Sequence, residues 1–373
     1  MKCAFGILAV ALLLAGCGSA ASPSAVAPTS VAPPATHPVK LSPLRYSSRT
    51  VSLANVSFAN AQCGWAVGDA GDKHGDPDGS FDGAVLRTRD GGATWKAQRI
   101  AKLGIPGAVT FVNAKDGWMV GGTATLGTIL ATTDGGATWV EQHPDAPGCS
   151  FADVAFADAE HGWVVGIHDG GAAPLFVTTD GGATWTRRHA PGEGGGLISV
   201  FFVNAKQGWV ADAGSDIYAT TDGGVSWKKQ YSSATLSVGA PVFANARDGW
   251  AVGTDSTWGN ATILATTDGG ASWAVQLNRA YPHNVFGGLG AVVAVDARHA
   301  WAVGRNGLIL ATSNGGVTWS KQKSATTADL YSVSFTDAWH GWAVGETDDG
   351  NGNFVSSTIL ATTDGGATWM KQK

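Results

Sequence analysis

The sequence predicts an all-β protein, a seven-bladed β-propeller with four antiparallel strands per blade. An octet of the form Thr-Thr-Asp-Gly-Gly-Ala-Thr-Trp recurs seven times in the 373 residues. Its closing tryptophans, from Trp95 to Trp369, are 44, 46, 42, 46, 46 and 50 residues apart. Each repeat holds four short runs rich in β-branched and aromatic residues, and no stretch has sustained helical periodicity. Four strands at this period are typical of a propeller blade.

The four runs follow one another in the same order in every repeat. The first alternates and ends in Phe and a polar turn, as in Val56–Asn60, and the second is Gly-Trp-Ala-Val-Gly, as in Gly64–Gly68. The third leads into the octet, as in Thr128–Thr132, and the fourth follows the octet's Trp, as in Trp319–Gln322. A single four-stranded sheet cannot bury both of its faces, so we expect the blades to pack in a closed ring.

The octets are predicted to be structural turns between the third and fourth strands. Their Asp, and the Thr or Ser four residues later, are short polar side chains that can accept N–H bonds within their own turn. The paired glycines allow positive φ, and the Trp is expected to turn inward. The predicted structural positions are Asp90, Asp134, Asp180, Asp222, Asp268, Asn314 and Asp364. One per blade, they are too far apart to act together on a substrate or a metal.

The pattern Ser/Thr-x-Asp-x-Gly-x-Thr-Trp resembles the Asp-box, or BNR repeat, of sialidases, sortilin-like receptors and related propellers. Together with Gly-Trp-Ala-Val-Gly, the unit resembles the photosystem II assembly and stability factor family of plants and cyanobacteria. Many exported bacterial propellers of unknown role share that repeat. The resemblance covers all seven repeats and implies a scaffold that binds other proteins, without implying that the source organism photosynthesises.

The N-terminus is predicted to be a processing signal. Lys2 gives it a positive charge, and Ala4–Ala15 is an apolar run too short to span a bilayer as a helix. The run ends in Leu-Ala-Gly before Cys17, which resembles a bacterial lipobox. The resemblance implies that Cys17 is lipidated and becomes the mature N-terminus; an ordinary signal peptide with an incidental cysteine is the alternative. We therefore expect an exported lipoprotein on the outer side of the cytoplasmic membrane or in the periplasm.

Three segments follow from this interpretation. Residues 1–17 are the signal, and residues 18–45, rich in Ala, Ser, Pro and Thr with almost no charge, are expected to be an extended tether. Residues 46–373 are expected to be the propeller. We expect the ring to close by face-to-face packing of the first and last blades, with strand exchange through Arg45–Thr50 as the alternative.

Cysteines and histidines are not predicted to form sites. Cys63 and Cys149 remain in the mature chain, and the repeat places them on opposite faces two blades apart, so a disulfide is not expected. His161, His299 and His340 share one turn position before the second strand, where other blades have Asp, Gln or Cys. A polar turn explains this position better than zinc binding.

Candidate functional residues lie on the face opposite the octets. Strands alternate in direction, so the loops between strands two and three share a face with the blade-to-blade connections, and these loops vary most. Two of them are acidic and belong to the neighbouring blades one and seven. Their candidate residues are Asp69, Asp76, Asp78, Asp82, Glu346, Asp348 and Asp349. The spacing of Asp76, Asp78 and Asp82 loosely resembles a calcium loop but lacks its full ligand pattern, so a calcium site and a solvated acidic loop both stay open.

Blade five and the connection after it supply the aromatic candidates Trp258, Tyr281 and His283. Trp258 is one of two tryptophans outside the repeat register. Such a side chain can stack on a sugar or anchor a protein partner, or it can fold over the end of its own blade.

Composition and motifs favour a binding protein over an enzyme. A net charge of −5 gives no reason to expect a nucleic-acid partner. The favoured function is a lipid-anchored, exported scaffold that binds an envelope or membrane protein, or a glycan, with no catalytic residues and no cofactor apart from the candidate calcium. The alternative is a glycoside hydrolase of the Asp-box class. The sequence lacks the arginine–isoleucine–proline motif of sialidases, and its five tyrosines have no evident glutamate partner.

Overall fold

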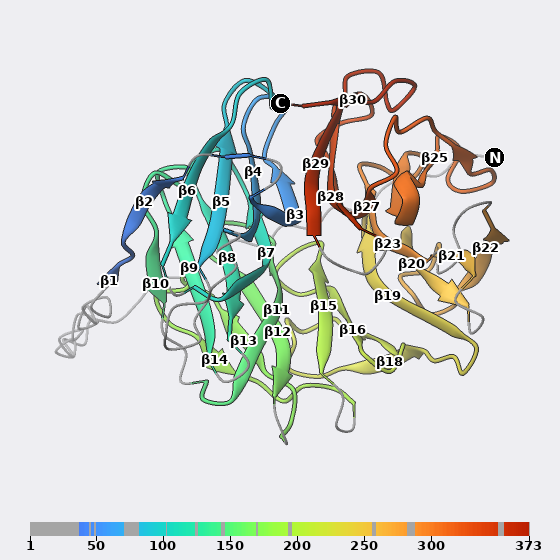
Figure 1. Ribbon diagram of the computed structural model, residues 1–373. Helices are drawn as coiled ribbons and strands as arrows, with labels where there is room; N and C mark the ends of the chain where they lie inside the picture. The colour runs from blue at the N-terminus through green and yellow to red at the C-terminus, as the bar shows by residue number, and fades with distance from the viewer. Residues whose placement is uncertain are drawn as a thin grey trace, which may run out of the picture. The chain divides into compact units, whose positions relative to one another are not determined.

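A computed structural model of the chain describes residues 37–44, 46–47, 50–70, 82–101, 103–123, 126–142, 146–168, 171–192, 196–255, 259–281, 288–349 and 354–372. These residues form seven antiparallel sheets, which confirms the predicted seven-bladed β-propeller (Figure 1). The short 3-10 turn η1 (Arg305–Gly307) is their one helical element. No helix in this part of the chain is long and apolar enough to cross a membrane.

Each blade contains four strands that pair in chain order, and the first strands of neighbouring blades contact one another around the ring. Blades one to four are β3 (Ser52–Phe58), β4 (Gly64–Asp69), β5 (Gly83–Thr88), β6 (Lys96–Ile100); β7 (Ile105–Phe111), β8 (Gly117–Gly122), β9 (Gly127–Thr132), β10 (Val140–Gln142); β11 (Cys149–Phe156), β12 (Gly162–His168), β13 (Leu175–Thr178), β14 (Thr186–Arg187); and β15 (Leu197–Phe202), β16 (Gly208–Asp212), β17 (Ile217–Thr220), β18 (Lys228–Tyr231). Blades five to seven are β19 (Leu236–Phe243), β20 (Gly249–Asp255), β21 (Asn260–Thr266), β22 (Ala274–Ala280); β23 (Leu289–Ala294), β24 (Ala300–Gly304), β25 (Ile309–Thr312), β26 (Ser320–Lys321); and β27 (Asp329–Phe335), β28 (Gly341–Asp348), β29 (Phe354–Thr362), β30 (Met370–Lys371).

Two short strands precede the first blade and lie along the outer edges of two blades. Strand β1 (His37–Pro38) pairs with β10 of blade two, and β2 (Leu41–Leu44) pairs with β6 of blade one (Figure 1). Both lie inside residues 18–45, which the sequence analysis assigned to the tether. Strand pairing in the described chain therefore begins at His37, earlier than the predicted propeller boundary at residue 46. The open edge of an outer strand can bind even a short segment of low hydrophobicity through its backbone.

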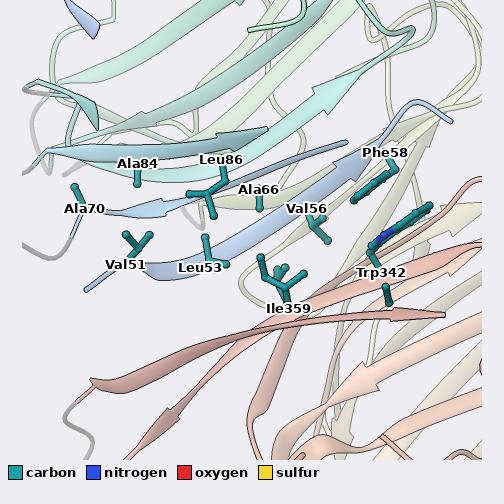
Figure 2. Packing of buried hydrophobic residues seen from close by; sticks show 12 residues of the cluster. Val51, Leu53, Val56, Phe58, Ala66, Ala70, Ala84, Leu86, Trp342 and Ile359 are labelled. Atoms are coloured by element: carbon teal, nitrogen blue, oxygen red, sulfur yellow. The ribbon is translucent and has the colours of Figure 1, made fainter. Parts of the chain in front are cut away.

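The ring closes by packing of blade seven on blade one, which is the closure expected from the sequence. All four strands of blade seven come from one continuous segment, so no strand is exchanged. Figure 2 shows the contact: Phe58 of blade one stacks on Trp342 of blade seven, beside the buried side chains of Leu53, Val56 and Ile359. The two ring centroids are 3.5 Å apart. Such aromatic pairs contribute about 0.5–1.5 kcal/mol beyond the area that they bury.

The Phe that ends the first strand explains the Gly that opens the second. A Cβ on Gly341 would lie only 2.2 Å from the ring of Phe335, and the same clash exists in five other blades. Blade six is the exception, because Ala294 stands in the Phe position and Ala300 in the Gly position. The small residue on the first strand leaves room for a Cβ on the second, so the two positions have changed together within one chain.

Candidate functional site

The loops divide into two faces, which we call the Asp-box face and the loop face. The Asp-box face holds the turns between strands one and two and the octet turns between strands three and four. The two kinds of turn are bonded within each blade; for example, the Gly91 amide donates to the Gln62 carbonyl and the Gly365 amide donates to the Trp339 carbonyl, both at 2.9 Å. The loop face holds the loops between strands two and three and the blade connections.

Every octet forms the same hydrogen-bonded turn. In blade two, Asp134 Oδ1 accepts from the Thr138 amide at 2.9 Å and from the Thr132 hydroxyl at 2.8 Å, and Asp134 Oδ2 accepts from the Thr138 hydroxyl at 2.7 Å. The hydroxyl that accepts a backbone amide is that of the octet's first residue: Thr132 Oγ1 accepts from Gly136 N at 2.9 Å. This corrects the expectation for the seventh residue, Thr138, whose hydroxyl donates.

The glycines and acceptors of the octets have uniform geometry. Both glycines have positive φ in all seven copies, from 71° at Gly91 to 94° at Gly92. Asn314 keeps the turn with one bond reversed, since its Nδ2 donates to Thr318 Oγ1 at 2.9 Å. The hydroxyl and the backbone amide of Thr94 both donate to the Asp90 carboxylate, and these bonds lower the pKa of Asp90 to about 2.

The octets also connect neighbouring blades. Trp301, on the second strand of blade six, stacks on Phe335 of blade seven at 3.7 Å and donates to the Gly365 carbonyl of the blade-seven octet at 2.9 Å. Gln322 of blade six donates to the same carbonyl at 3.2 Å and accepts from Trp369 Nε1 at 3.0 Å. The octet is therefore a structural joint between blades as well as a turn within one.

This joint is incomplete at several seams. Blade three has Arg188 where blade two has Gln142, and Trp227 Nε1 of blade four is buried without a partner in the described chain. At the seam between blades five and six, Trp250 lacks an aromatic partner on the next blade, where Ala294 stands, and donates to Gln276 of its own blade at 3.2 Å.

The histidines of the Asp-box face contact aspartates of their own turns, and the two cysteines are not bonded to each other. His161, His299 and His340 each lie within 3.1 Å of the Asp three residues earlier in the same turn. Cys63 and Cys149 are both free thiols.

On the loop face, the first strands carry a ring of irregular positions around the central channel. In six blades, one residue of the first strand has no partner on the second strand, and it lies four residues before the last residue of that first strand. Blade five has a longer irregularity, which begins at the equivalent glycine, Gly239. The seven positions are Ala54, Gly107, Ala152, Ile198, Gly239, Gly290 and Tyr331. Neighbours in this ring lie close together: a Cβ on Gly239 would be 3.1 Å from Ile198 Cδ1, and one on Gly107 would be 2.8 Å from the Ala152 carbonyl oxygen.

Two members of this ring differ from the rest. Five positions have Gly or Ala, whereas Ile198 and Tyr331 are large and 40% and 41% exposed. Two exposed large side chains in a ring of small residues are candidate anchors for a partner, because binding hot spots consist of a few such side chains. Neither residue was among the candidates predicted from the sequence. Counting back four residues from the end of each first strand would have found them, because they alone break the Gly/Ala pattern.

Tyr331 connects this ring to one of the predicted acidic residues. Its hydroxyl donates to Glu346 Oε1 at 2.9 Å, and Ser52 of blade one donates to Glu346 Oε2 at 2.6 Å. Burial and this carboxylate raise the pKa of Tyr331 well above its usual value. Glu346 therefore lies at the seam between blades seven and one and accepts from two hydroxyl donors. Tyr331 thus has a glutamate partner, which was not evident from the sequence.

The other predicted site residues are only partly brought together. Asp69 ends β4, Asp348 ends β28, and Asp349 follows it, so all three lie on the loop face of blades one and seven. Asp82 precedes β5 and forms an ion pair with Arg99 at 3.1 Å. Asp76, Asp78, Trp258 and His283 lie outside the described residues, so the calcium prediction for Asp76, Asp78 and Asp82 stays a prediction. No group of three metal-ligand side chains occurs among the residues that the structure describes.

Tyr281 follows the outer strand of blade five and lies at the seam with blade six. The Arg279 guanidinium carbon is 5.6 Å and Lys321 Nζ is 5.9 Å from its ring centroid, so cations of both blades flank it. Burial raises the pKa of Tyr281, and Arg279 partly opposes that shift.

A second carboxylate, which was not predicted from the sequence, lies on the first strand of blade three. Asp153 Oδ2 accepts from the Val200 amide of blade four at 2.9 Å, and its Oδ1 accepts from the Val154 amide at 2.8 Å. Burial raises the pKa of Asp153 to about 6 in spite of these bonds. This carboxylate holds two neighbouring blades together close to the channel.

Comparison with known proteins agrees with the repeat and the fold. A family model described as photosynthesis system II assembly factor YCF48 matches residues 146–246 and 237–326, which together are just under half of the chain and correspond to blades three to six. No curated protein matches the chain significantly.

Several solved structures share the fold. A YCF48 structure described as bound to D1 peptide is 19% identical, with a TM-score of 0.60, and the match covers 88% of this chain and 97% of that one. YCF48 from Cyanidioschyzon merolae is 20% identical, with a TM-score of 0.61, over 87% of this chain and 98% of that one. The RRP9 WD40 repeats reach a TM-score of 0.62 at only 9% identity, over 88% and 99%. In its repeat and in its seven-bladed fold, the chain resembles the photosystem II assembly factor YCF48 family.

Proposed function

We propose that this chain is a non-enzymatic scaffold that binds a protein partner through the ring of irregular first-strand positions on its loop face. The observation that carries the proposal is the pair Ile198 and Tyr331, two exposed large side chains in a ring otherwise made of Gly and Ala. The octet carboxylates are committed to their own turns and lie on the other face. A YCF48 of the same fold is described as bound to a D1 peptide, which supports a peptide segment as the ligand.

We also propose that the partner is a protein of the membrane or envelope. The lipobox-like sequence before Cys17 supports a lipid anchor on an exported chain, and an anchored propeller meets membrane partners at a high effective concentration. Cys17→Ala should prevent lipidation, so the mass of the lipid carried by the parent protein should be missing from the variant. A membrane-extracted parent protein without that mass would contradict the anchor.

Site-specific photo-crosslinking tests the binding face. A benzophenone amino acid at Ile198 or Tyr331 should give the same crosslinked partner in membranes of the source organism. The matched controls are Val317 and Trp339, which are 82% and 61% exposed on the Asp-box face. The proposal predicts no partner from these positions. Equal crosslinking from both faces, or crosslinking from the Asp-box face alone, would overturn it.

A panel of chromogenic glycosides tests the absence of catalysis on the same protein. Turnover that is lost in Asp349→Asn would establish a hydrolase and refute the scaffold proposal. A glycan array run in parallel tests for a sugar ligand, which would bind to this protein in the absence of the crosslinked partner.

A further inference from the structure

The outer edges of the seven blades are not all alike. In blades one and two, short segments from the N-terminal part of the chain pair with the fourth strand, β2 with β6 and β1 with β10. In the other five blades, the fourth strand is the last strand of its sheet in the described chain. The outward N–H and C=O groups of such an edge strand can pair with a further extended segment. The first two blades show that the outer edge of this propeller binds segments of this kind.

Four of the five open edges are poorly suited to such pairing. β14, β26 and β30 have only two residues each. β18 has four residues, but it begins with the exposed Lys228 and Lys229, and lysines on an edge strand discourage the addition of another strand. β22 is different, since it has seven residues and Arg279 is its only charged one. It is therefore the open edge best suited to bind a further strand.

The second half of β22 is both regular and exposed. Its pairing with β21 is irregular at Gln276 and regular over the four residues from Leu277 to Ala280. Three of these four, Asn278, Arg279 and Ala280, are exposed. β2, which occupies the edge of blade one, also has four residues. A segment as long as β2 therefore fits on this half of β22.

The charge beside this edge indicates what the segment carries. The Arg279 guanidinium carbon and Lys321 Nζ of blade six lie over the ring of Tyr281, 5.6 Å and 5.9 Å from its centroid. Neither cation forms an ion pair with a carboxylate of the described chain. Side chains directly opposite one another in antiparallel strands share one face of the sheet and lie in contact, and opposite charges in such pairs are stabilising. An acidic residue opposite Arg279 would therefore meet a cation on the side of the sheet that carries Tyr281.

The same features argue against other occupants. A basic segment would place like charges opposite one another, which is destabilising. The N-terminal strands of a second copy do not fit, because β1 and β2 contain no acidic residue and already pair within their own chain. Two copies joined through β22 would bring both Arg279 side chains into one four-residue interface.

We propose that blade five binds an extended, acidic segment of another protein as a fifth strand, antiparallel to Leu277–Ala280 of β22, with a carboxylate of the segment beside Arg279. The backbone of β22 supplies the affinity, and Arg279 with Lys321 selects the charge. This site lies at the outer edge of blade five and does not depend on the loop-face binding proposed above.

A fluorophore-labelled peptide, acetyl-Val-Thr-Glu-Thr-Val-amide, tests the proposal. Fluorescence anisotropy measures its affinity, and amide hydrogen exchange locates it. We expect slower exchange in β22 at saturation, and binding weaker by about tenfold when lysine replaces the glutamate of the peptide. Successive residues of a strand point their N–H groups in alternate directions. N-methylation of one alternate set of peptide amides should therefore abolish binding, and N-methylation of the other set should leave it within about twofold.

A charge reversal on the protein provides the matched test. Arg279→Glu should weaken the glutamate peptide by about tenfold and should bind the lysine peptide more tightly than the parent protein does. Arg298→Glu, the same change at an exposed position on the Asp-box face, should leave both affinities unchanged.

Four results would overturn the proposal. They are no binding of the glutamate peptide at millimolar concentration, equal binding of the two peptides, tolerance of both N-methylated sets, and slower exchange only outside β22. Protection of β22 in a dimer of the protein alone would assign the edge to a second copy instead.

Discussion

The two faces of this propeller use the same strands for opposite purposes. On the Asp-box face, seven copies of one octet repeat nearly the same bonds, and their glycines are held at positive φ. On the loop face, the equivalent strand ends differ from blade to blade, and the ring around the channel holds two exposed large side chains among five small ones. Uniform geometry fits a structural joint, because every seam has the same task. Variation fits recognition, because a partner breaks the symmetry of the ring.

The largest difference between the faces should appear in glycine-to-alanine substitutions. Gly341→Ala places a Cβ 2.2 Å from the Phe335 ring and should lower the free energy of unfolding by about 3 kcal/mol. Gly290→Ala on the loop face should be nearly neutral, because its nearest neighbour would be 3.5 Å away. Denaturant unfolding measures both.

The pair Ala294 and Ala300 of blade six indicates how to rescue Gly341→Ala. Phe335→Ala alone should cost about 3 kcal/mol, yet the double variant should lose at least about 1 kcal/mol less than the sum of the single losses. Additive losses would show that the ring and the glycine are not coupled.

The stabilisation that Asp153 provides and the stabilisation that the octet carboxylates provide should change in opposite directions with pH. Asp153 has a raised pKa of about 6 in the folded chain, so its stabilisation is present below pH 4 and is lost as the pH rises through 6. The stability of the parent protein relative to Asp153→Asn should therefore fall by on the order of 3 kcal/mol between pH 4 and pH 7. The octet carboxylates, with a pKa of about 2 at Asp90, lose their stabilisation only as the pH falls from 4 to 2. Parallel stability curves for the two proteins between pH 4 and 7 would contradict the assignment.

A single octet carboxylate should matter less than the packing. Asp134→Ala removes acceptors for the Thr138 amide and for two hydroxyls, and should cost about 1–2 kcal/mol. Asp134→Asn should cost only about half as much as Asp134→Ala, because Asn314 forms the same turn in blade six. Both variants should crosslink the partner from Tyr331 as the parent does. Loss of crosslinking with the fold intact would mean that the Asp-box face takes part in binding.

The smallest predicted effect is a gain in the free energy of unfolding at the seam between blades three and four, where the joint lacks a hydrogen bond. Arg188→Gln supplies the acceptor that Trp227 Nε1 lacks and should stabilise the protein by about 1 kcal/mol, as Gln322 does for Trp369. The gain should vanish in a Trp227→Phe background. A gain that persists there would come from the removal of the Arg188 charge instead.

Much of the Asp-box face could be predicted from the sequence. The octet contains its own acceptors, its own glycines and its own Trp, so residues within eight positions specify the turn. The bonds that join blades could not be predicted in the same way. Trp301 and Gly365 are 64 residues apart, and nothing local indicates that one donates to the other.

The loop face was predictable only as a location. Strand alternation placed Glu346, Asp348 and Tyr281 on it, and the long acidic loops were the predicted functional segments. The strand irregularities that bring Ile198 and Tyr331 to the channel were not predicted. An irregular residue in a strand depends on the pairing of two strands, and the alternating pattern of one strand does not show it.

The sequence by itself determined the number of blades, the order of the strands and the turn that ends each third strand, because these depend on local chemistry repeated seven times. Only the tertiary structure decided where β1 and β2 bind, which seams lack a bond, and how Ser215 and Ser237 of neighbouring blades come to lie 3.4 Å apart. Those features depend on contacts between blades, where residues far apart in the chain meet.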